Sequence, residues 1–517
     1  MNYNYQKMRV EGDFMKNVLE YLEKSALTSS QKIIDESQSC SYQELYIQSQ
    51  RIGSQLAKMI PCRQAVPLFC QKSVDCLSAF FGSVYAGCFY VLLNPELPAN
   101  RLQQILSILE SDYVLTNQEH YAQAVEYFEG KTILLIEDLK QGDIDEDVLN
   151  TIRKQHLDID PLYVQFTSGS TGVPKGVVVS HRSVIDFIDC FVEIFDFTSD
   201  DVIANQAPFD FDVSVKDIYS AMSTGASLVI VPKKLFSLPT ELIDFLCDHN
   251  ITTMTWAVSA LCLISTFHGL DYKVPMTLKK VLFSGEVMPM KHLDYWMNHY
   301  PDVTFVNLYG PTEITCNCLY HVIDKNRDYQ GRIPVGIPFP NEKVFLLDEN
   351  NKEVKNDNQV GEICVSGTAL ALGYYGNTEQ TQSHFVQNPL NPHYLEMIYR
   401  TGDLGFYQEG DMYFSGRKDF QIKYRGHRIE LEEIEKAVGE FEGVERGICL
   451  FEEQKSQLFV FYVGSLQKKE LFTLMKENLP AYMIPSRIIP VDDFPLTKNG
   501  KVDRKELMKK GARRHAS

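Results

Sequence analysis

One short segment, QFTSGSTGVPKG at 165–176, constrains this chain more than any other. An apolar run precedes it at 162–164 and a second follows it at 177–179, which predicts two short strands joined by a loop too rich in Gly and Ser to be core. Gly169 and Gly172 have no Cβ, so backbone N–H groups can converge on a phosphate, with hydroxyls and Lys175 beside them. The Walker A spacing is absent. Because Pro-Lys-Gly closes the segment, a phosphate loop is favoured over a merely solvated Gly/Ser loop.

Bulk composition narrows the class of protein. The 517 residues allow two or three domains, and 44% hydrophobic with 23% charged residues is typical of globular proteins. A net charge of −18 argues against nonspecific binding to nucleic acid or to an anionic membrane, so we expect neither as a partner. The N-terminus shows no secretory signal, and no apolar window is long enough to span a bilayer. The 12 cysteines form no zinc or disulfide pattern, so we expect reduced thiols and a cytoplasmic protein.

Strand and helix patterns alternate through the first part of the chain. Ser41 with Glu44 three residues later predicts a helix N-cap. Repeated strand–helix–strand units predict an α/β fold of doubly wound, parallel sheets. The strands are predicted at 32–35, 66–70, 88–93, 113–116, 132–136 and 227–231, with a helix at 74–87.

The pattern changes after residue 342. Short strands within 343–415 predict a β-rich subdomain. Beyond Gly416, strands at 421–424 and 458–463 alternate with helices at 432–438 and 470–479, which predicts a small α+β C-terminal domain. We place the boundary at Asp419, giving an N-terminal core of 1–418 and a C-terminal domain of 419–517.

Two further segments combine carboxylates with apolar or turn-forming neighbours. In PFDFDVSVKDIY (208–219), Asp210 and Asp212 either cap a helix or receive a cation such as an ammonium group, since an unpaired buried carboxylate is costly. In NLYGPTE (307–313), the Gly-Pro turn leaves Tyr309 and Glu313 on a loop at the carboxyl end of a strand, where open α/β sheets bind ligands. The alternative for both loop residues is a solvated surface position.

Two more segments follow later in the chain. Asp403 comes after the glycine of YRTGDL, where a carboxylate can accept hydrogen bonds from the two hydroxyls of a ribose; a plain Asx-turn is the alternative. Asn499-Gly500 predicts a hairpin turn that presents Lys501 at its tip. Alone, Lys501 is indistinguishable from a solvated surface lysine.

Seven motifs occur together in one order: TSGSTGVPKG, FDFDVS, NLYGPTE, GEICVSG, YRTGDL, GRKDFQIKYRGHRIE and NGKVDR. In this order they resemble the adenylate-forming superfamily over essentially the whole chain. The chain is most similar to amino-acid adenylation domains of nonribosomal peptide synthetases and to D-alanine–carrier protein ligases. The resemblance implies ATP-dependent activation of an amino acid to aminoacyl-AMP, release of pyrophosphate, and thioester transfer to the phosphopantetheine of a separate carrier protein.

The resemblance also implies roles for individual residues around ATP and Mg²⁺. The triphosphate is assigned to five residues of the glycine-rich loop: Thr167, Ser168, Ser170, Thr171 and Lys175. Adenine and ribose are assigned to four: Asn307, Tyr309, Asp403 and Arg417. Thr312 would contact the α-phosphate, Glu313 would bind Mg²⁺, and Lys501 would bridge the substrate carboxylate and the α-phosphate. The C-terminal domain would then swing about Asp419, removing Lys501 and bringing the loop 426–428 to the site.

Asp212 favours an amino acid, because in the amino-acid-activating branch an Asp at this position pairs with the substrate α-ammonium. The other predicted lining positions are Val213, Lys216, Ser259, Leu282, Ser284, Leu308, Cys316 and Asn317. Four of them resemble serine-type pockets, but Lys216 departs from that pattern. Lys216 either pairs with an acidic side chain or extends outward and narrows the site. Ser, Ala, Asp and Glu therefore all stay open as substrates.

Other functions remain as alternatives. An acyl- or aryl-CoA ligase shares the superfamily, but such enzymes usually lack the Asp at position 212. A luciferase-like oxygenase is disfavoured for the same reason. A non-catalytic nucleotide-binding protein is disfavoured because Lys175, Glu313, Asp403 and Lys501 occur together. The chain ends soon after Lys501, so we expect a free-standing enzyme whose carrier protein is supplied in trans. The basic tail at 509–514 either helps to dock an acidic carrier or is a solvated end.

Overall fold

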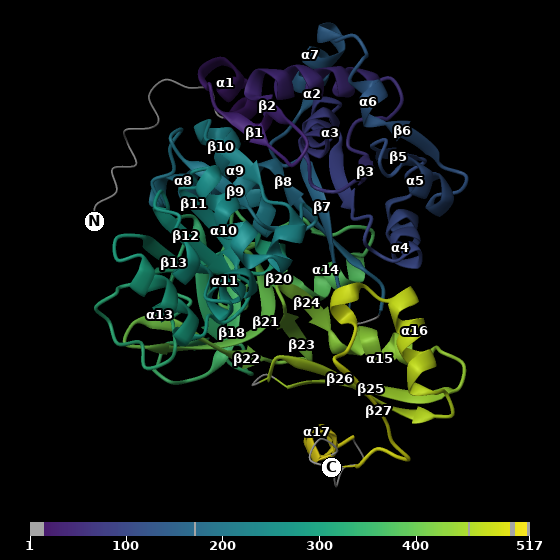
Figure 1. Cartoon of the computed structure of the whole chain (residues 1–517), viewed down its shortest axis with the longest axis vertical. Coiled ribbons are helices and arrows are strands. Elements are labelled where there is room, and N and C mark those ends of the chain that lie inside the picture. The colour runs from purple at the N-terminus through teal and green to yellow at the C-terminus, as the bar shows by residue number, and fades with distance from the viewer. Residues whose placement is uncertain (1–14, 170–171, 453–454, 497–501, 514–517) are drawn as a thin grey trace.

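The structure is a computed structural model that describes residues 15–169, 172–452, 455–496 and 502–513. Its fold is mixed α/β, with a large N-terminal domain followed by a smaller C-terminal domain, as predicted (Figure 1). No helix within these described ranges is long and apolar enough to span a membrane.

The glycine-rich segment connects two strands of the first sheet. Among the described residues this sheet has seven strands in the order β19-β8-β7-β4-β3-β5-β6. β7 and β8 pair antiparallel with Thr167 opposite Lys175, which confirms the predicted strand–loop–strand unit. The strands β3 to β7 pair in parallel. The bounds are β3 Ala65–Phe69, β4 Phe89–Leu93, β5 Tyr113–Thr116, β6 Thr132–Leu135, β7 Pro161–Thr167, β8 Lys175–Ser180 and β19 Gly373–Tyr374.

The second sheet carries three of the predicted substrate residues, Leu282 and Ser284 on β12 and Leu308 on β13. Its nine strands, counted over the described residues, run in the order β15-β14-β13-β12-β11-β9-β10-β1-β2. The central strands are parallel, but β2, β14 and β15 join antiparallel, so the sheet is mixed rather than wholly parallel. The connections from β1 to β2 and from β13 to β14 are too short for a parallel crossover. The bounds are β1 Lys32–Ile34, β2 Ser39–Ser41, β9 Val202–Asn205, β10 Ser227–Ile230, β11 Thr253–Ala257, β12 Lys280–Ser284, β13 Thr304–Tyr309, β14 Leu319–Val322 and β15 Ile337–Pro338.

Helices cover these sheets, and α9 connects them. The predicted N-cap is confirmed, since Ser41 and Glu44 form a reciprocal capping box at the start of α2. Helix α9 packs on β9 and β11 of the second sheet, and its Tyr219 hydroxyl lies 2.9 Å from the Tyr90 hydroxyl of β4 in the first. The bounds are α1 Leu19–Thr28, α2 Tyr42–Leu56, α3 Val74–Tyr85, α4 Ala99–Leu109, α5 Tyr121–Tyr127, α6 Ile136–Leu139, α7 Glu146–Gln155, α8 His181–Ile194, α9 Val213–Thr224, η1 Lys233–Ser237, α10 Pro239–Asp248, α11 Val258–Thr266, α12 Gly269–Tyr272 and α13 Met290–His299.

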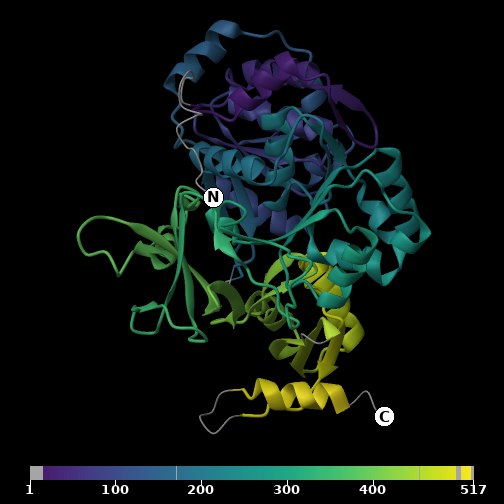
Figure 2. The ribbon, with the colours of Figure 1, turned by 90° about the vertical axis from the view of Figure 1, so that its left-hand side faces the viewer.

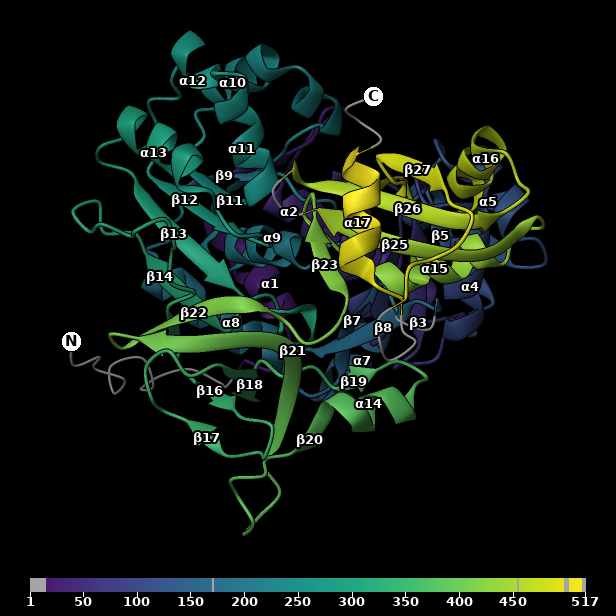
Figure 3. The ribbon, with the colours of Figure 1, turned by 90° about the horizontal axis from the view of Figure 1, so that it is seen from below.

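A β-rich subdomain follows, as predicted. Asp403 lies within the long strand β21 rather than in a turn, because Gly402 takes a positive φ of 72° without ending the strand. Figure 3 shows β21 and β22 running beside the C-terminal domain. The bounds are β16 Glu342–Leu347, β17 Glu353–Val354, β18 Gly361–Gly367, α14 Thr378–His384, β20 Phe385–Gln387, β21 Met397–Gln408 and β22 Asp411–Arg417.

The C-terminal part of the chain has cores of its own. Ile434, Val460 and Met475 are fully or almost fully buried among residues drawn from 422–488. In Figure 1 this segment (yellow) lies below α4, and in Figure 2 the helix α17 lies at the end of the molecule farthest from the first helices. The bounds are β23 Gln421–Tyr424, β24 His427–Glu430, α15 Leu431–Gly439, β25 Val444–Glu452, β26 Gln457–Gly464, α16 Lys468–Asn478, η4 Ala481–Met483, β27 Arg487–Pro490 and α17 Arg504–Arg513.

Candidate active site

Ten of the predicted nucleotide and substrate residues meet at one cavity of about 130 Å³. It opens where β7, the start of α9, the carboxyl end of β12 and the strand β21 approach one another. The carboxyl ends of parallel strands are where this class of sheet binds ligands. The predicted residues that line it are Thr167, Ser168, Asp212, Val213, Ser284, Thr312, Cys316, Asn317, Asp403 and Arg417.

Two donors of the glycine-rich loop, on Ser168 and Gly169, point at the C-terminal domain. The Ser168 hydroxyl donates to the backbone oxygen of Arg428 at 2.8 Å, and the Gly169 N–H donates to Glu433 at 3.2 Å. Only glycine fits at 169, because a Cβ would lie 2.0 Å from the Val173 carbonyl oxygen. Ser170 and Thr171 lie outside the described residues. The Thr167 hydroxyl is buried without a partner among the described residues, so it is available to a ligand.

Lys175 lies at the start of β8 with 6% of its surface exposed. Its Nζ is 3.7 Å from Glu430 Oε1. Burial and the nearby Arg428 guanidinium lower the pKa of Lys175, whereas Glu430 and Glu313 oppose them. The lysine therefore needs an anion beside it, and in this conformation Glu430 supplies one.

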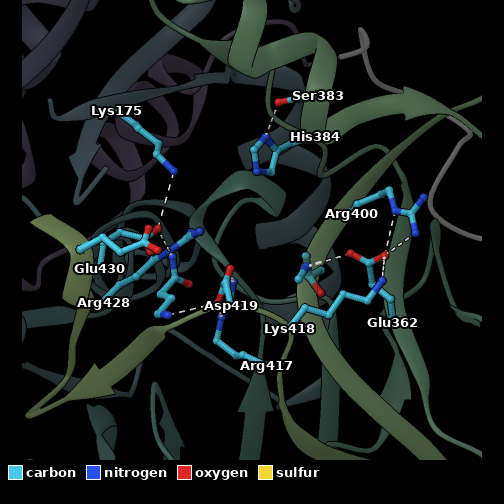
Figure 4. A pocket seen from close by; sticks show the side chains of 14 residues that line it. Lys175, Glu362, Ser383, His384, Arg400, Arg417, Lys418, Asp419, Arg428 and Glu430 are labelled. Carbon is cyan, nitrogen blue, oxygen red and sulfur yellow. Dashed lines mark hydrogen bonds and ion pairs between the residues drawn. The ribbon is translucent and has the colours of Figure 1, made fainter. Parts of the chain in front are cut away.

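Lys175 also borders a second cavity of about 370 Å³, drawn in Figure 4. Arg417, Lys418 and Arg428 line it together with acidic side chains, among them Asp419 and Glu430. Figure 4 shows Lys418 and Arg400 both pointing at Glu362, which accepts from them at 2.9 and 2.8 Å. Because charged side chains form its wall, this cavity suits a hydrated anionic group of a ligand better than an apolar group.

Tyr309 and Asp403 contact each other directly. Tyr309 ends β13 and is 6% exposed, so the alternative of a solvated loop tyrosine is wrong: the Gly-Pro turn starts one residue later. Its hydroxyl donates to Asp403 Oδ2 at 2.5 Å, and Arg417 pairs with Oδ1. Each carboxylate oxygen keeps a further lone pair for a ribose hydroxyl. Lys423 Nζ lies 5.3 Å from the centre of the Tyr309 ring.

Asn307 lies on β13, two residues before Tyr309, and is 8% exposed. Its Nδ2 donates to the Pro334 carbonyl at 2.8 Å. The side-chain oxygen is thereby left free to accept a hydrogen bond, which suits the amino group of an adenine.

Glu313 is completely buried in the short helix η2 (Thr312–Ile314), so the alternative of a solvated loop carboxylate is wrong. Arg428 Nη1 donates to both of its oxygens, at 2.9 and 2.8 Å, and Tyr374 donates at 2.8 Å. Burial raises the pKa of Glu313, but Arg428 and the hydrogen bonds outweigh it and bring this pKa to about 2. Glu313 is therefore a permanent anion.

The donor set fits a nucleotide-bound Mg²⁺. The described residues contain no cluster of three or more His, Cys, Asp or Glu side chains that would hold a metal by themselves. Mg²⁺ in nucleotide enzymes is commonly held by one or two carboxylates together with phosphate oxygens and water. Glu313 supplies one such carboxylate, and its present partner Arg428 shows that a cation is accommodated there.

The predicted substrate residues lie around Asp212. The Thr312 hydroxyl is hydrogen-bonded to Asp212; burial raises the pKa of Asp212, while Thr312 and Lys216 lower it. Leu282 and Leu308 are buried on the neighbouring strands β12 and β13.

Four predicted substrate residues do not line the cavity: Lys216, Ser259, Leu282 and Leu308. Lys216 lies behind the wall and donates to Asn317 and Ser284. Ser259 lies next to Gly426, where an added Cβ would be 3.7 Å from its hydroxyl.

Sequence reasoning missed the side chains that join the two domains. Glu433 pairs with Arg101 of α4, and both side chains are under a tenth exposed. Glu286 accepts from the Gly426 N–H at 2.8 Å. Glu430 and Lys423 lie inside the motif GRKDFQIKYRGHRIE, which was a usable signal. Arg101 lies in a segment without any motif, so no pattern pointed to it.

Comparisons with known proteins agree with this geometry. The model of the AMP-binding enzyme family matches residues 14–375. Surfactin synthase subunit 3 of Bacillus subtilis (strain 168) is 31% identical over 91% of this chain and 37% of its own length. The D-alanine–D-alanyl carrier protein ligase of Bacillus licheniformis is 29% identical over 95% of this chain and 98% of its own length.

The fold comparison points the same way. The Vibrio cholerae adenylation domain AlmE, solved in complex with glycyl-adenosine-5'-phosphate, aligns with a TM-score of 0.82 over 97% of this chain and 99% of that one, at 21% identity, a likeness of fold. The chain spans only 6% to 37% of the length of three curated peptide synthetase relatives. The match to the family model over most of the chain, together with the shared fold, places this protein in the AMP-binding enzyme family.

Proposed function

We propose that this protein activates an amino acid with ATP, forming aminoacyl-AMP and pyrophosphate, and then transfers the aminoacyl group to the phosphopantetheine thiol of a carrier protein supplied as a separate chain. One observation carries the proposal: Asp212 lines the same cavity as Ser168, Thr312 and Asp403. No cation of the described residues forms an ion pair with Asp212, so a substrate ammonium can take that place.

In the first step a carboxylate oxygen of the amino acid attacks the α-phosphorus of ATP, and the bond to pyrophosphate breaks. Ser168, Thr167 and Lys175 hold the phosphates, and Asp403 with Arg417 beside it holds the ribose. Thr312 contacts the α-phosphate while it also hydrogen-bonds Asp212, which orients the two reactants toward each other. Lys501, outside the described residues, is assigned to the charge that develops between carboxylate and α-phosphate.

Glu313 is the residue that would hold Mg²⁺, which supplies charge neutralisation for the phosphates when bound. In this conformation Arg428 keeps the pKa of Glu313 low, and a bound Mg²⁺ would take over that role as the neighbouring cation. For that to happen Arg428 must leave Glu313, and this couples metal binding to the position of the C-terminal domain.

We assign the conformation described here to the second step. Three groups of the C-terminal domain take the places proposed for the metal and the phosphates: Arg428 on Glu313, Glu430 near Lys175, and Glu433 on the Gly169 N–H. Pyrophosphate must leave before these contacts form. The thiol then attacks the carbonyl carbon of the adenylate, the bond to AMP breaks, and AMP departs.

The C-terminal domain must change its position between the two steps, which requires a hinge. We assign the hinge to Asp419, between an N-terminal domain of residues 1–418 and a C-terminal domain of residues 419–517. Asp419 lies between the end of β22 and the start of β23 and accepts two hydrogen bonds from Arg417. The buried clusters beyond it draw on residues 422–508 and are separate from the clusters of the N-terminal domain. This separation supports rotation of one body against another.

A cytoplasmic location is part of the proposal. ATP is a cytoplasmic substrate, and all twelve cysteines, each within the described ranges, are free thiols. The proposed partners are an amino acid and a phosphopantetheinylated carrier protein, with no nucleic acid and no membrane.

The proposal is tested by trapping the adenylate with hydroxylamine as an aminoacyl hydroxamate in the presence of ATP, MgCl₂ and each common amino acid in turn. We expect one amino acid or a small group to give hydroxamate, and Asp212→Ala to abolish it with ATP binding retained. If only fatty or aromatic acids give hydroxamate, the protein is an acyl- or aryl-CoA ligase of the same fold.

A further inference from the structure

Lys216 is a buried lysine behind the wall of the active-site cavity. It lies in the first turn of α9 and is 1% exposed. Its Nζ donates to Asn317 Oδ1 at 2.8 Å and to Ser284 Oγ at 3.3 Å. Both partners are neutral, and within the described residues no carboxylate lies within 4 Å of this ammonium. An ammonium buried in this way is costly unless an anion joins it.

The lysine fixes the direction of two hydrogen-bonding groups at the cavity wall. An ammonium has only donors, so the oxygen of the Asn317 amide must face Lys216 and its Nδ2 must face away. The Ser284 oxygen likewise accepts from Lys216, which leaves its O–H to donate elsewhere. Asn317 and Ser284 both line the cavity. This part of the cavity therefore presents donors, with a positive charge behind them.

Another part of the same cavity carries a negative charge, on the carboxylate of Asp212. Asp217, the neighbour of Lys216 on α9, accepts from Asn205 at 3.0 Å and so already has a partner. Burial lowers the pKa of Lys216, while Cys316, Asp212 and Asp217 raise it. The cavity thus combines a carboxylate for an ammonium with a set of donors for an acceptor.

We propose that the substrate is an amino acid whose side chain ends in a carboxylate, bound by the Asn317 amide and the Ser284 hydroxyl with Lys216 behind them. This inference rests on the proposed function, because Asp212 takes the α-ammonium and the α-carboxylate is left to react. Hydrogen bonds to a charged acceptor are roughly twice as strong as neutral ones. An uncharged acceptor such as a side-chain amide or hydroxyl would leave the buried lysine without an anion.

The test is ATP–pyrophosphate exchange with aspartate, glutamate, asparagine, glutamine, alanine and serine in both stereoisomers. We expect kcat/KM for one acidic amino acid to exceed that for its amide by at least about 100-fold, since a site with unpaired buried polar groups rejects an analogue that cannot satisfy them. Exchange that prefers alanine, serine or an amide overturns the inference but leaves the proposed function intact. Exchange with no amino acid at all overturns the proposed function.

Variants distinguish a role of the Lys216 charge in substrate selection from a purely structural role of this side chain. Lys216→Met should raise KM for the acidic substrate and bring the acid-to-amide ratio near one. Lys72→Met is the control, because Lys72 is a second lysine whose pKa burial lowers, although its side chain keeps some exposure, and it donates to the Gln206 carbonyl at 2.8 Å; the acid-to-amide ratio of this variant should stay that of the parent. If Lys216→Met does not fold, Asn317→Asp serves instead, since it replaces a donor by an acceptor and should reverse the preference toward the amide. An unchanged ratio in the folded variant overturns the inference.

Discussion

Arg428 of the C-terminal domain donates from one guanidinium nitrogen to both carboxylate oxygens of Glu313, at 2.9 and 2.8 Å. Glu313 is completely buried and Arg428 largely so. The pair joins the two domains at the carboxylate that we propose as the Mg²⁺ ligand. Because the guanidinium and the metal compete for the same oxygens, the pair and a metal-bound nucleotide exclude each other.

Arg428→Ala should slow the transfer step and spare adenylation. Removing one partner of a buried ion pair costs about 3–5 kcal/mol, so the transfer conformation should become rarer by a factor on the order of 100 or more. Single-turnover thioester formation from preformed adenylate, with pantetheine as the acceptor, measures this. Arg425→Ala is the control, because Arg425 is exposed and three residues away. Equal losses in adenylation and transfer would contradict the proposed role.

Glu433→Gln should act on the same step through a different contact. Glu433 pairs with Arg101 and accepts from the Gly169 N–H, so the neutral side chain leaves Arg101 buried without its counter-ion when the domains close. We expect a fall in transfer rate on the order of 100-fold with little change in pyrophosphate exchange. The exposed Glu432→Gln serves as the control. A variant that transfers at the parental rate would show that the contact is incidental.

Asp419→Pro should uncouple the two steps in the same direction. Proline fixes φ near −65°, which prevents the rotation that the hinge requires. Adenylate formation should continue while thioester formation stops. Asp419→Asn, which keeps one of the two acceptors for Arg417 and leaves φ unrestricted, should retain both. Undiminished thioester formation by the proline variant would place the hinge elsewhere.

The transfer step should weaken in acid because of His427. Its ring stacks on Tyr482, with centroids 3.9 Å apart, and packs edge-on against Phe211. Burial, with a smaller contribution from Lys233, lowers the pKa of His427 to about 4 from its usual 6.5. We expect domain opening to restore the usual pKa, so that between pH 6.5 and pH 4 the open form binds more protons than the closed form. The equilibrium constant for closure therefore falls as pH falls below 6.5, by about tenfold at pH 5.5.

The measurement for His427 is the rate of thioester formation between pH 7.5 and 5.5 for the parent relative to His427→Gln. This ratio cancels the ionisation of the acceptor thiol, which is common to both proteins. The ratio should fall with pH, whereas a constant ratio would show that His427 does not titrate with closure.

The parts of the fold and site that sequence predicts are those set by neighbours along the chain. The capping box of Ser41 and Glu44 and the strands on either side of the glycine-rich loop are local, and both were predicted. Tyr309 and Asp403 were assigned to turns because Gly402 and Gly310 stand beside them, but strand pairing outweighs that local preference. The Arg101–Glu433 pair joins positions 332 residues apart, and nothing local encodes it.

The most direct test of the central claim is ATP–pyrophosphate exchange measured for the parent and for Asp212→Ala over all common amino acids. The account predicts exchange that depends on an added amino acid and that Asp212→Ala abolishes, since the variant lacks the carboxylate for the α-ammonium. Exchange that proceeds equally well with Asp212→Ala, or that requires a fatty or aromatic acid, would contradict it.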